Sequence, residues 1–316
     1  MPIHTSPDTC QANLKVIQQK MRTKVLFSYE DLLEEVAEFS RRGVETGEIG
    51  KSVLNRSIPY IFIGDKTKPC LIVQGAIHAR EHITALLVVC QAKYLLKNTH
   101  LKLLGGVYFL PMTNPDGVKL CQEGVGFLKN KQLKSNLIAI NRGKTDFSLW
   151  KANANGVDLN TNFDACWGEG ERNVFCKASE NYVGKQPFCE PETQALRDFT
   201  LKVNPVCTLS YHCKGEQIFW RFSQDEERLA TDRRLAEGLA RQTGYQLVSG
   251  QASCGGYKDW CIQTLKIPAF TLEVGNDKFA HPFPYQQFDN VYFPNQDIPR
   301  KLLNSVITMG QDKETL

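Results

Sequence analysis

Several features that assign a function quickly are missing from this sequence of 316 residues. No run of apolar residues approaches the ~20 that a membrane-spanning helix needs, so we expect no membrane partner. The 38 basic and 34 acidic residues leave a net charge of only +4. The basic residues are scattered and form no long Lys/Arg run, so we expect no nucleic-acid partner either.

A secreted disulfide framework is also absent. The chain has 11 cysteines, but no two form a C-x-x-C pair and their spacing is irregular. The opening residues, MPIHTSPDTCQANLKVIQQKM, lack a basic segment followed by an apolar one, so they do not resemble a signal peptide. We therefore predict mostly reduced thiols and a cytoplasmic location, unless an export signal has been trimmed away. The sequence predicts no oligomeric state.

The pattern that is present is an alternation of strands and helices. Hydrophobic residues make up 42% of the chain and charged residues 23%, which is typical of a globular protein. Neither a linker nor a repeat interrupts the alternation. We predict a single α/β domain over residues 26–316, with a mixed, mainly parallel central sheet and helices on both faces. Residues 1–25 are interpreted as an N-terminal lead-in segment.

Three local patterns give more specific expectations. Residues 27–42 have helical periodicity, and Ser28 with Asp31 three residues later resembles a capping box. The strand-like runs 57–64 and 69–78 are joined by a Gly-Asp turn, which indicates a hairpin. Residues 119–165 are polar and rich in Gly and Asn, and a long irregular stretch of this kind is usually functional.

Histidine is scarce, and two of the six histidines end predicted strands. His78 ends the run 69–78, and His212 ends the run 205–212. Ligands of α/β sheets collect beyond the carboxyl ends of strands. Glu81 follows His78 by three residues, so one helical turn can aim both side chains at one point. Catalytic zinc commonly takes three protein ligands and leaves one position open. The alternative is that these are solvated polar residues at a helix start, because an isolated H-x-x-E is frequent by chance.

Six motifs together decide between these interpretations. They are HARE (78–81), NPDG (114–117), GVDLNTN (156–162), SYHCKG (210–215), GGYKDW (255–260) and FTLEVG (270–275). They occur in the order found in the zinc carboxypeptidase, or funnelin, family, and they span most of the chain. The sequence therefore resembles that family, and the α/β fold predicted above is the fold that the resemblance implies.

The resemblance implies a site residue by residue. His78, Glu81 and His212 would hold one Zn²⁺ per chain, and Glu273 would be the general base. Asp158 would orient the ring of His78 and strengthen it as a ligand. A buried carboxylate at the end of a strand needs a partner in any case, and a metal site supplies one for Glu273. Cys213 is not expected to reach the ion, because neighbouring strand residues point to opposite faces.

The residues that would bind substrate depart from the family pattern. Thr161 stands where the family has an arginine that clamps the terminal carboxylate, and a hydroxyl cannot make that bidentate contact. Asn155 takes the place of an arginine that stabilises the oxyanion, and its amide can still donate a hydrogen bond. Arg80 and Asn160 are retained. Tyr257 is the nearest, displaced counterpart of the tyrosine that closes over substrates.

Lys258 occupies the position of the family's specificity residue, unless it is simply an exposed lysine in a turn. As a cation facing the substrate, it would favour a departing residue with an additional carboxylate. The chain looks most like the bacterial branch that cleaves γ-D-glutamyl–meso-diaminopimelate bonds in murein peptides. Three alternatives remain: a carboxypeptidase for acidic C-terminal residues, an amide hydrolase for small molecules, and a non-catalytic peptide-binding relative.

Overall fold

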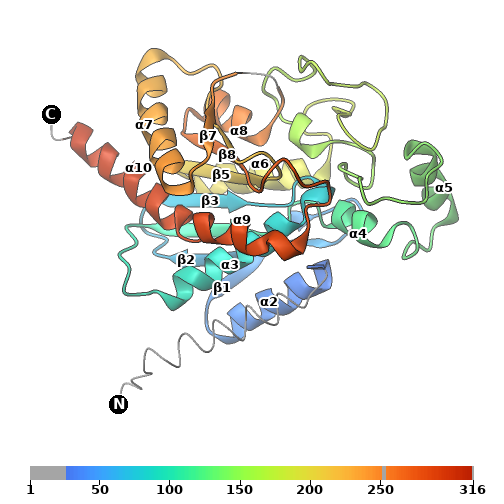
Figure 1. Ribbon diagram of the computed structural model, residues 1–316, viewed down its shortest axis with the longest axis horizontal. Helices are drawn as coiled ribbons and strands as arrows, with labels where there is room; N and C mark the ends of the chain where they lie inside the picture. The colour runs from blue at the N-terminus through green and yellow to red at the C-terminus, as the bar shows by residue number, and fades with distance from the viewer. Residues whose placement is uncertain (1–25, 251–253, 315–316) are drawn as a thin grey trace.

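The computed structural model describes residues 26–250 and 254–314, so the lead-in segment predicted for residues 1–25 lies outside the described residues. An eight-stranded sheet with the order β1-β2-β4-β3-β5-β8-β6-β7 runs through this part of the chain (Figure 1). The strands are β1 (Glu45–Lys51), β2 (Ser57–Gly64), β3 (Cys70–Gln74), β4 (Gly106–Leu110), β5 (Cys207–His212), β6 (Gln217–Phe219), β7 (Gln246–Val248) and β8 (Ala269–Glu273).

Helices connect and cover the strands. The α-helices are α2 (Tyr29–Arg41), α3 (Ile83–Lys97), α4 (Pro115–Glu123), α5 (Lys131–Ile140), α6 (Pro191–Val203), α7 (Glu226–Thr243), α8 (Tyr257–Trp260), α9 (Phe288–Asn295) and α10 (Ile298–Glu314). Single helical turns are η1 (Ala79–Glu81), η2 (Leu159–Thr161) and η4 (Tyr285–Gln287), and η3 (Cys261–Leu265) is a short π-helix. No helix of the described residues is long and apolar enough to cross a bilayer.

The sheet is mixed and its centre is parallel. β3 pairs in parallel with β4 and β5, and β5 pairs in parallel with β8. Antiparallel pairs occur where β1 meets β2, β2 meets β4, and β6 meets β8. The predicted α/β fold with a mainly parallel central sheet is confirmed.

The predicted hairpin between the second and third strands is wrong. β2 pairs with β4, which lies between β2 and β3 in the sheet. All five residues of β3 are buried, so this strand needs neighbours on both sides and helices on both faces. The crossover through α3 supplies β4 as one of those neighbours. The Gly-Asp turn after β2 reverses the chain but does not pair β2 with β3.

Helices cover both faces of the sheet (Figure 1). The larger core packs residues of α2, α3, α7, α9 and α10 against one face, and a second core packs α6 and α8 against the other. Alternation along β5 divides its side chains between these faces. Leu209 and Tyr211 belong to the larger core, and Ser210 and His212 therefore point to the side of the second core.

Two local predictions have different outcomes. The capping box of α2 is confirmed, because Ser28 Oγ accepts from the Asp31 amide at 3.1 Å and Asp31 Oδ2 accepts from the Ser28 amide at 2.9 Å. The stretch 119–165 is less irregular than predicted, since it contains α5 and η2. Leu137 of α5 is buried in a small third core, which explains why this polar segment forms a helix.

Candidate active site

The carboxyl ends of three neighbouring parallel strands bring the predicted zinc ligands and base together. His212 is the last residue of β5, Glu273 is the last residue of β8, and the two are register partners. Partners in adjacent strands point to the same face, so both side chains lie on the side of the second core. His78 follows β3, which is the other neighbour of β5.

A tight turn after β3 directs the third ligand back toward the strands. Ala76 has a positive φ of 47°, and its amide donates to Thr84 Oγ1 at 2.8 Å. Two residues later His78 precedes the single turn η1, and that turn returns Glu81 to the histidine. Apolar residues of β3 and α3 on either side bury this polar turn, which is why a short motif holds a defined geometry.

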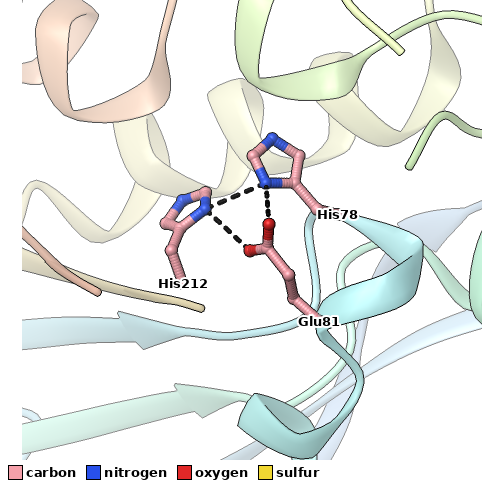
Figure 2. Close-up of side chains that lie close together, drawn as sticks. All are labelled: His78, Glu81 and His212. Atoms are coloured by element: carbon pink, nitrogen blue, oxygen red, sulfur yellow. Dashed lines mark hydrogen bonds and ion pairs between the residues drawn. The ribbon is translucent and has the colours of Figure 1, made fainter. Parts of the chain in front are cut away.

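The three side chains converge on one point (Figure 2). His78 Nδ1 lies 2.9 Å from Glu81 Oε1, and His212 Nδ1 lies 3.1 Å from Glu81 Oε2. The two Nδ1 atoms lie 3.0 Å from each other. All three residues are buried, and their ligand atoms lie within 4.8 Å of one another. Burial favours the neutral form of Glu81, but the two imidazoles hold its pKa well below the usual range.

The chemistry of these donor atoms fits a divalent metal ion. The two Nδ1 atoms lie 3.0 Å apart, and as lone-pair donors they would both face the point that the Glu81 carboxylate also faces. A cation at that point would be bound by both imidazoles and the carboxylate. Two imidazoles and one carboxylate form one of the ligand sets of catalytic zinc. The His-Glu-His group can therefore hold the ion that the sequence predicts.

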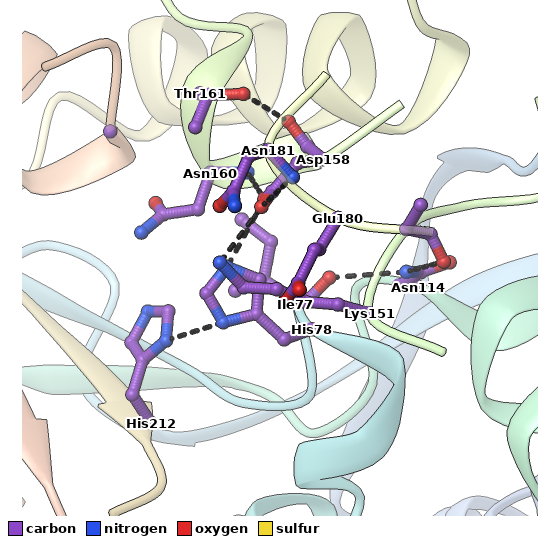
Figure 3. A network of polar contacts seen from close by, with 12 residues as sticks. Ile77, His78, Asn114, Lys151, Asp158, Asn160, Thr161, Glu180, Asn181 and His212 are labelled. Carbon is purple, nitrogen blue, oxygen red and sulfur yellow. Dashed lines mark hydrogen bonds and ion pairs between the residues drawn. The ribbon is translucent and has the colours of Figure 1, made fainter. Parts of the chain in front are cut away.

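Asp158 orients His78 from the opposite side of the ring (Figure 3). Its Oδ1 lies 3.2 Å from His78 Nε2, and its Oδ2 lies 2.8 Å from the ammonium group of Lys151. The backbone amides of Asn160 and Asn181 also donate to this carboxylate. Burial would raise the pKa of Asp158, but Lys151 and His78 hold it well below its usual range. The charged carboxylate fixes the ring so that Nδ1 faces the metal position.

Sequence reasoning missed two residues of this region. Lys151 is only 15% exposed, and burial would lower its pKa, but the carboxylates of Asp158 and then Glu81 raise it. Burial lowers the pKa of His281, in the loop after β8, and the charge of Glu81 opposes that change. The only signal for Lys151 was its place in the polar stretch 119–165, and none existed for His281.

Glu273 lies at the edge of a pocket. It is half-buried and lines a cavity of about 90 Å³ together with Asn160, Lys258, Asp259, Arg221 and Thr271. Burial raises the pKa of Glu273 to about 7, and His212 opposes that rise. A bound cation would lower this pKa by stabilising the carboxylate. The carboxylate is thus accessible, and its pKa lies near neutral pH. Both properties suit a residue that accepts and donates protons.

Lys258 lines the same pocket and is buried. Its Nζ lies 2.5 Å from Asp259 Oδ1 and donates to the Arg221 carbonyl at 3.3 Å. Its ammonium also lies over the ring of Phe222, 5.4 Å from the centroid. The alternative of an exposed lysine in a turn is wrong, because Lys258 belongs to α8 and its side chain is 10% exposed. The pocket therefore contains a buried pair of opposite charges, with Arg221 beside it.

Two retained family residues take different positions. Asn160 lines the pocket, and its Oδ1 accepts from the Tyr257 amide at 3.1 Å. Arg80 is half-buried, and its Nη1 donates to Glu180 Oε2 at 3.0 Å and to the Leu149 carbonyl at 3.3 Å. Asn160 is thus available to a substrate in the pocket, whereas Arg80 would have to exchange an ion pair for a substrate contact.

Asn155 and Thr161 already have protein partners. The Asn155 amide donates to Glu190 Oε2 at 2.8 Å, so this donor is directed away from any oxyanion. The hydroxyl of Thr161 donates to the Asp158 carbonyl at 2.9 Å and is buried. Both side chains therefore support the loop that carries Asp158.

Tyr257 belongs to the core and not to the pocket surface. Its side chain is fully buried, and its hydroxyl lies 2.8 Å from Thr200 Oγ1. The ring packs against Phe163 and Trp260. Lys258 points into the pocket and Tyr257, the preceding residue of the same helix, points away from it. Tyr257 therefore packs in the second core.

Cys213 and His82 are close in sequence to the ligands but serve other purposes. The Cys213 amide donates to Glu81 Oε2 at 3.2 Å, while its side chain packs into the larger core. This is the opposite-face geometry expected for the neighbour of His212. His82 is buried against Tyr285, whose hydroxyl lies 2.8 Å from His82 Nδ1, and burial lowers the pKa of His82 to about 4.

Comparison with known proteins now assigns the family. Residues 29–300 match the zinc carboxypeptidase family, peptidase family M14, and the chain belongs to this family. The family that the sequence motifs indicate is thus confirmed. A gamma-D-glutamyl-L-diamino acid endopeptidase 1 from Lysinibacillus sphaericus is 36% identical over 257 residues, which are 77% of this chain and 63% of that relative. The chain therefore spans less than two thirds of that relative's length.

Solved structures give the same fold at lower identity. Bovine thrombin-activatable fibrinolysis inhibitor superposes with a TM-score of 0.74 at 20% identity, covering 92% of this chain and 99% of that one. Murein-tripeptide amidase MpaA from Escherichia coli O157 superposes with a TM-score of 0.51 at 23% identity, covering 82% of this chain and 91% of that one. These likenesses confirm the predicted single α/β architecture.

Proposed function

We propose that the chain hydrolyses an amide bond with Glu273 as general base, and that His78, Glu81 and His212 are the zinc ligands. The convergence of the three ligand side chains beside a half-buried carboxylate supports this assignment. Zinc bound there would polarise a carbonyl and lower the pKa of a bound water toward ~7. The ligands come from the turn after β3 and from the end of β5, so the sheet fixes their spacing.

Glu273 would take a proton from the attacking water and deliver it to the departing amine. Its pairing with His212 in adjacent strands sets the carboxylate beside the ligand cluster. Lys151 would keep Asp158 charged, and the charged carboxylate would hold the ring of His78 in the orientation that a ligand needs. Asn160 is the pocket amide best placed to hold a polar group of the substrate.

The substrate that this pocket fits best is a murein peptide with meso-diaminopimelate after a γ-D-glutamyl bond. The observation that carries this proposal is the group of charges on the pocket wall: Lys258 and Arg221 are cationic, and Asp259 is anionic. The side chain of diaminopimelate ends in an ammonium and a carboxylate. The ammonium can pair with Asp259, and the carboxylate can pair with Lys258. The name of the Lysinibacillus relative agrees with a diamino acid at this position.

One assay tests this function directly. Purified enzyme is incubated with L-Ala-γ-D-Glu-meso-diaminopimelate, and release of diaminopimelate is followed by mass spectrometry. The same tripeptide with lysine in place of diaminopimelate tests the second head group, because lysine lacks the distal carboxylate. Cleavage of ordinary C-terminal peptides with neutral residues, and none of the murein tripeptide, would contradict the proposed substrate.

A carboxypeptidase for acidic C-terminal residues is the second candidate. It uses the same zinc and base, and the cations Lys258 and Arg221 favour it as well. The carboxylate of Asp259 does not, because an acidic side chain offers no ammonium to it. A peptide ending in glutamate, with a free or an amidated C-terminus, separates the two functions, since a carboxypeptidase requires the free carboxylate.

Lys258→Met is expected to lower kcat/KM on the diaminopimelate tripeptide about 10- to 150-fold, the effect of a lost charge-assisted hydrogen bond of roughly 1.5–3 kcal/mol. Methionine keeps most of the stem and removes the charge that meets the distal carboxylate. The lysine-containing tripeptide should lose little. Steady-state kinetics on both substrates give the comparison, with Lys185→Met, an exposed lysine outside the pocket, as control. An equal loss on both substrates would mean that Lys258 supports the pocket without selecting its occupant.

A further inference from the structure

Two segments far apart in the sequence meet beside the pocket. Residues 163–166 follow η2, and residues 254–256 precede α8. The Gly255 amide donates to the Ala165 carbonyl at 2.7 Å, and the Phe163 amide donates to the Gly255 carbonyl at 2.9 Å. Gly255 has a φ of +79°, and a Cβ there would meet the Thr161 carbonyl oxygen at 2.7 Å. The backbones therefore lie in direct contact, held by two hydrogen bonds.

A cysteine lies next to this contact on each segment. Cys166 follows Ala165, and Cys254 precedes Gly255. Both cysteines are thiols, and Cys254 lies close enough to Cys166 to influence the pKa of its thiol, which also donates to Gln263 Oε1 at 3.8 Å. Both are half-buried and pack against the second core, so their side chains face the same region while remaining accessible to a small reagent. The two backbone hydrogen bonds therefore keep the cysteines close together in the folded chain, as a disulfide requires.

We propose that Cys166 and Cys254 form a reversible disulfide that ties the start of α8 to the loop after η2. The step requires an oxidant, and a small disulfide such as oxidised glutathione suffices. The thiolate of one cysteine attacks the small disulfide and releases one small thiol, and the second cysteine then attacks the mixed disulfide and releases the other. Two electrons and two protons leave the protein, and the small disulfide becomes two thiols.

The cross-link would act on the pocket through α8. Gly256 and Lys258, two and four residues after Cys254, line the pocket, and the Gly256 amide donates to Asp259 Oδ2 at 3.1 Å. A cross-link at Cys254 would therefore restrict the backbone that positions the ion pair of Lys258 and Asp259 in the pocket. Burial raises the pKa of Cys166, and Glu169 and Asp259 raise it further, so the thiolate fraction at neutral pH is small. The disulfide forms by slow exchange, and the pair is not a fast peroxide sensor.

The test compares the protein after incubation with oxidised glutathione and after reduction with dithiothreitol. Free thiols are then alkylated, and the protein is digested with trypsin without reduction. Cleavage at Lys and Arg places each cysteine in a peptide with no other cysteine, residues 152–172 and residues 242–258. We expect these two peptides joined in the oxidised sample alone. The oxidised protein should also melt roughly 5 °C higher, because the cross-link restricts the unfolded chain.

Matched variants make the result specific. Cys166→Ser and Cys254→Ser should each abolish the joined peptide and the redox-dependent change in Tm, and alanine at either position repeats the test if serine impairs folding. Cys176→Ser, which removes an exposed cysteine of the same region, should keep both. Oxidation that joins other peptides, or no joined peptide at all, overturns the proposal. None of these measurements uses hydrolysis, so the result is independent of the proposed function.

Discussion

Glu273→Gln is expected to lower kcat about 10²- to 10⁴-fold, the usual effect of losing a general base. Glutamine has nearly the same shape, so it removes the proton-accepting charge without opening a cavity. Zinc content and Tm should stay close to those of the parent enzyme, because Glu273 lies beside the ligand cluster and is not one of its three members. Turnover on the murein tripeptide and metal analysis of the same preparation give the measurement.

The pH profile provides an independent check on this role. A base must be ionised to accept a proton, so activity should be present above the pKa of Glu273 and fall as the pH drops through it. Burial raises this pKa to about 7 in the protein without an ion, and a bound cation shifts it downward. We therefore expect an acidic limb of kcat/KM below neutrality that Glu273→Gln lacks. An unchanged acidic limb in the variant, or near-normal turnover, would show that another residue activates the water.

His212→Ala is expected to lose most of its zinc and nearly all of its activity. One ligand of three is removed, and the Nδ1 atom of His78 and the carboxylate of Glu81 alone make a weak site. Metal analysis after dialysis should find about one equivalent in the parent enzyme and a small fraction of that in the variant.

Cys213→Ala is the matched control for this variant. Its side chain packs in the larger core on the opposite face of β5, so the substitution should lower stability somewhat and leave the zinc equivalent intact. Full retention of zinc by His212→Ala, or its loss in Cys213→Ala, would contradict the ligand assignment. Both variants should be compared at the same degree of folding, as judged by circular dichroism.

The sequence predicted those parts of the molecule that a regular period controls. His212 and Glu273 end strands. Side chains alternate between the two faces of a sheet with a period of two residues, and this places both on one face. The single turn between His78 and Glu81 follows from their spacing of three. The capping box of α2 is equally local, since the side chains of Ser28 and Asp31 each bond to the other's backbone amide. Such features need no knowledge of the rest of the fold.

Other features depend on contacts that no local pattern contains. The hairpin prediction failed because β4, which comes later in the sequence, inserts between β2 and β3. Thr161 and Tyr257 lie in very short elements, where contacts with distant residues help to set the direction of a side chain: the Tyr182 carbonyl for one and Thr200 for the other. Lys151 shows the same limit, because only the folded chain brings it to Asp158.

The parallel pairing of β5 with β8 has a consequence for how this enzyme can diverge. The separation of His212 and Glu273 is set by a ladder of backbone hydrogen bonds, which is insensitive to the identity of most side chains. Much of the pocket wall comes instead from η2, from α8 and from the residues that follow β6. On the proposed mechanism, substitutions in those segments can redirect the enzyme to a new leaving group while the zinc ligands and the base stay unchanged. A shift of β8 by a single residue would instead turn Leu272 or Val274 toward the site and abolish hydrolysis of every substrate.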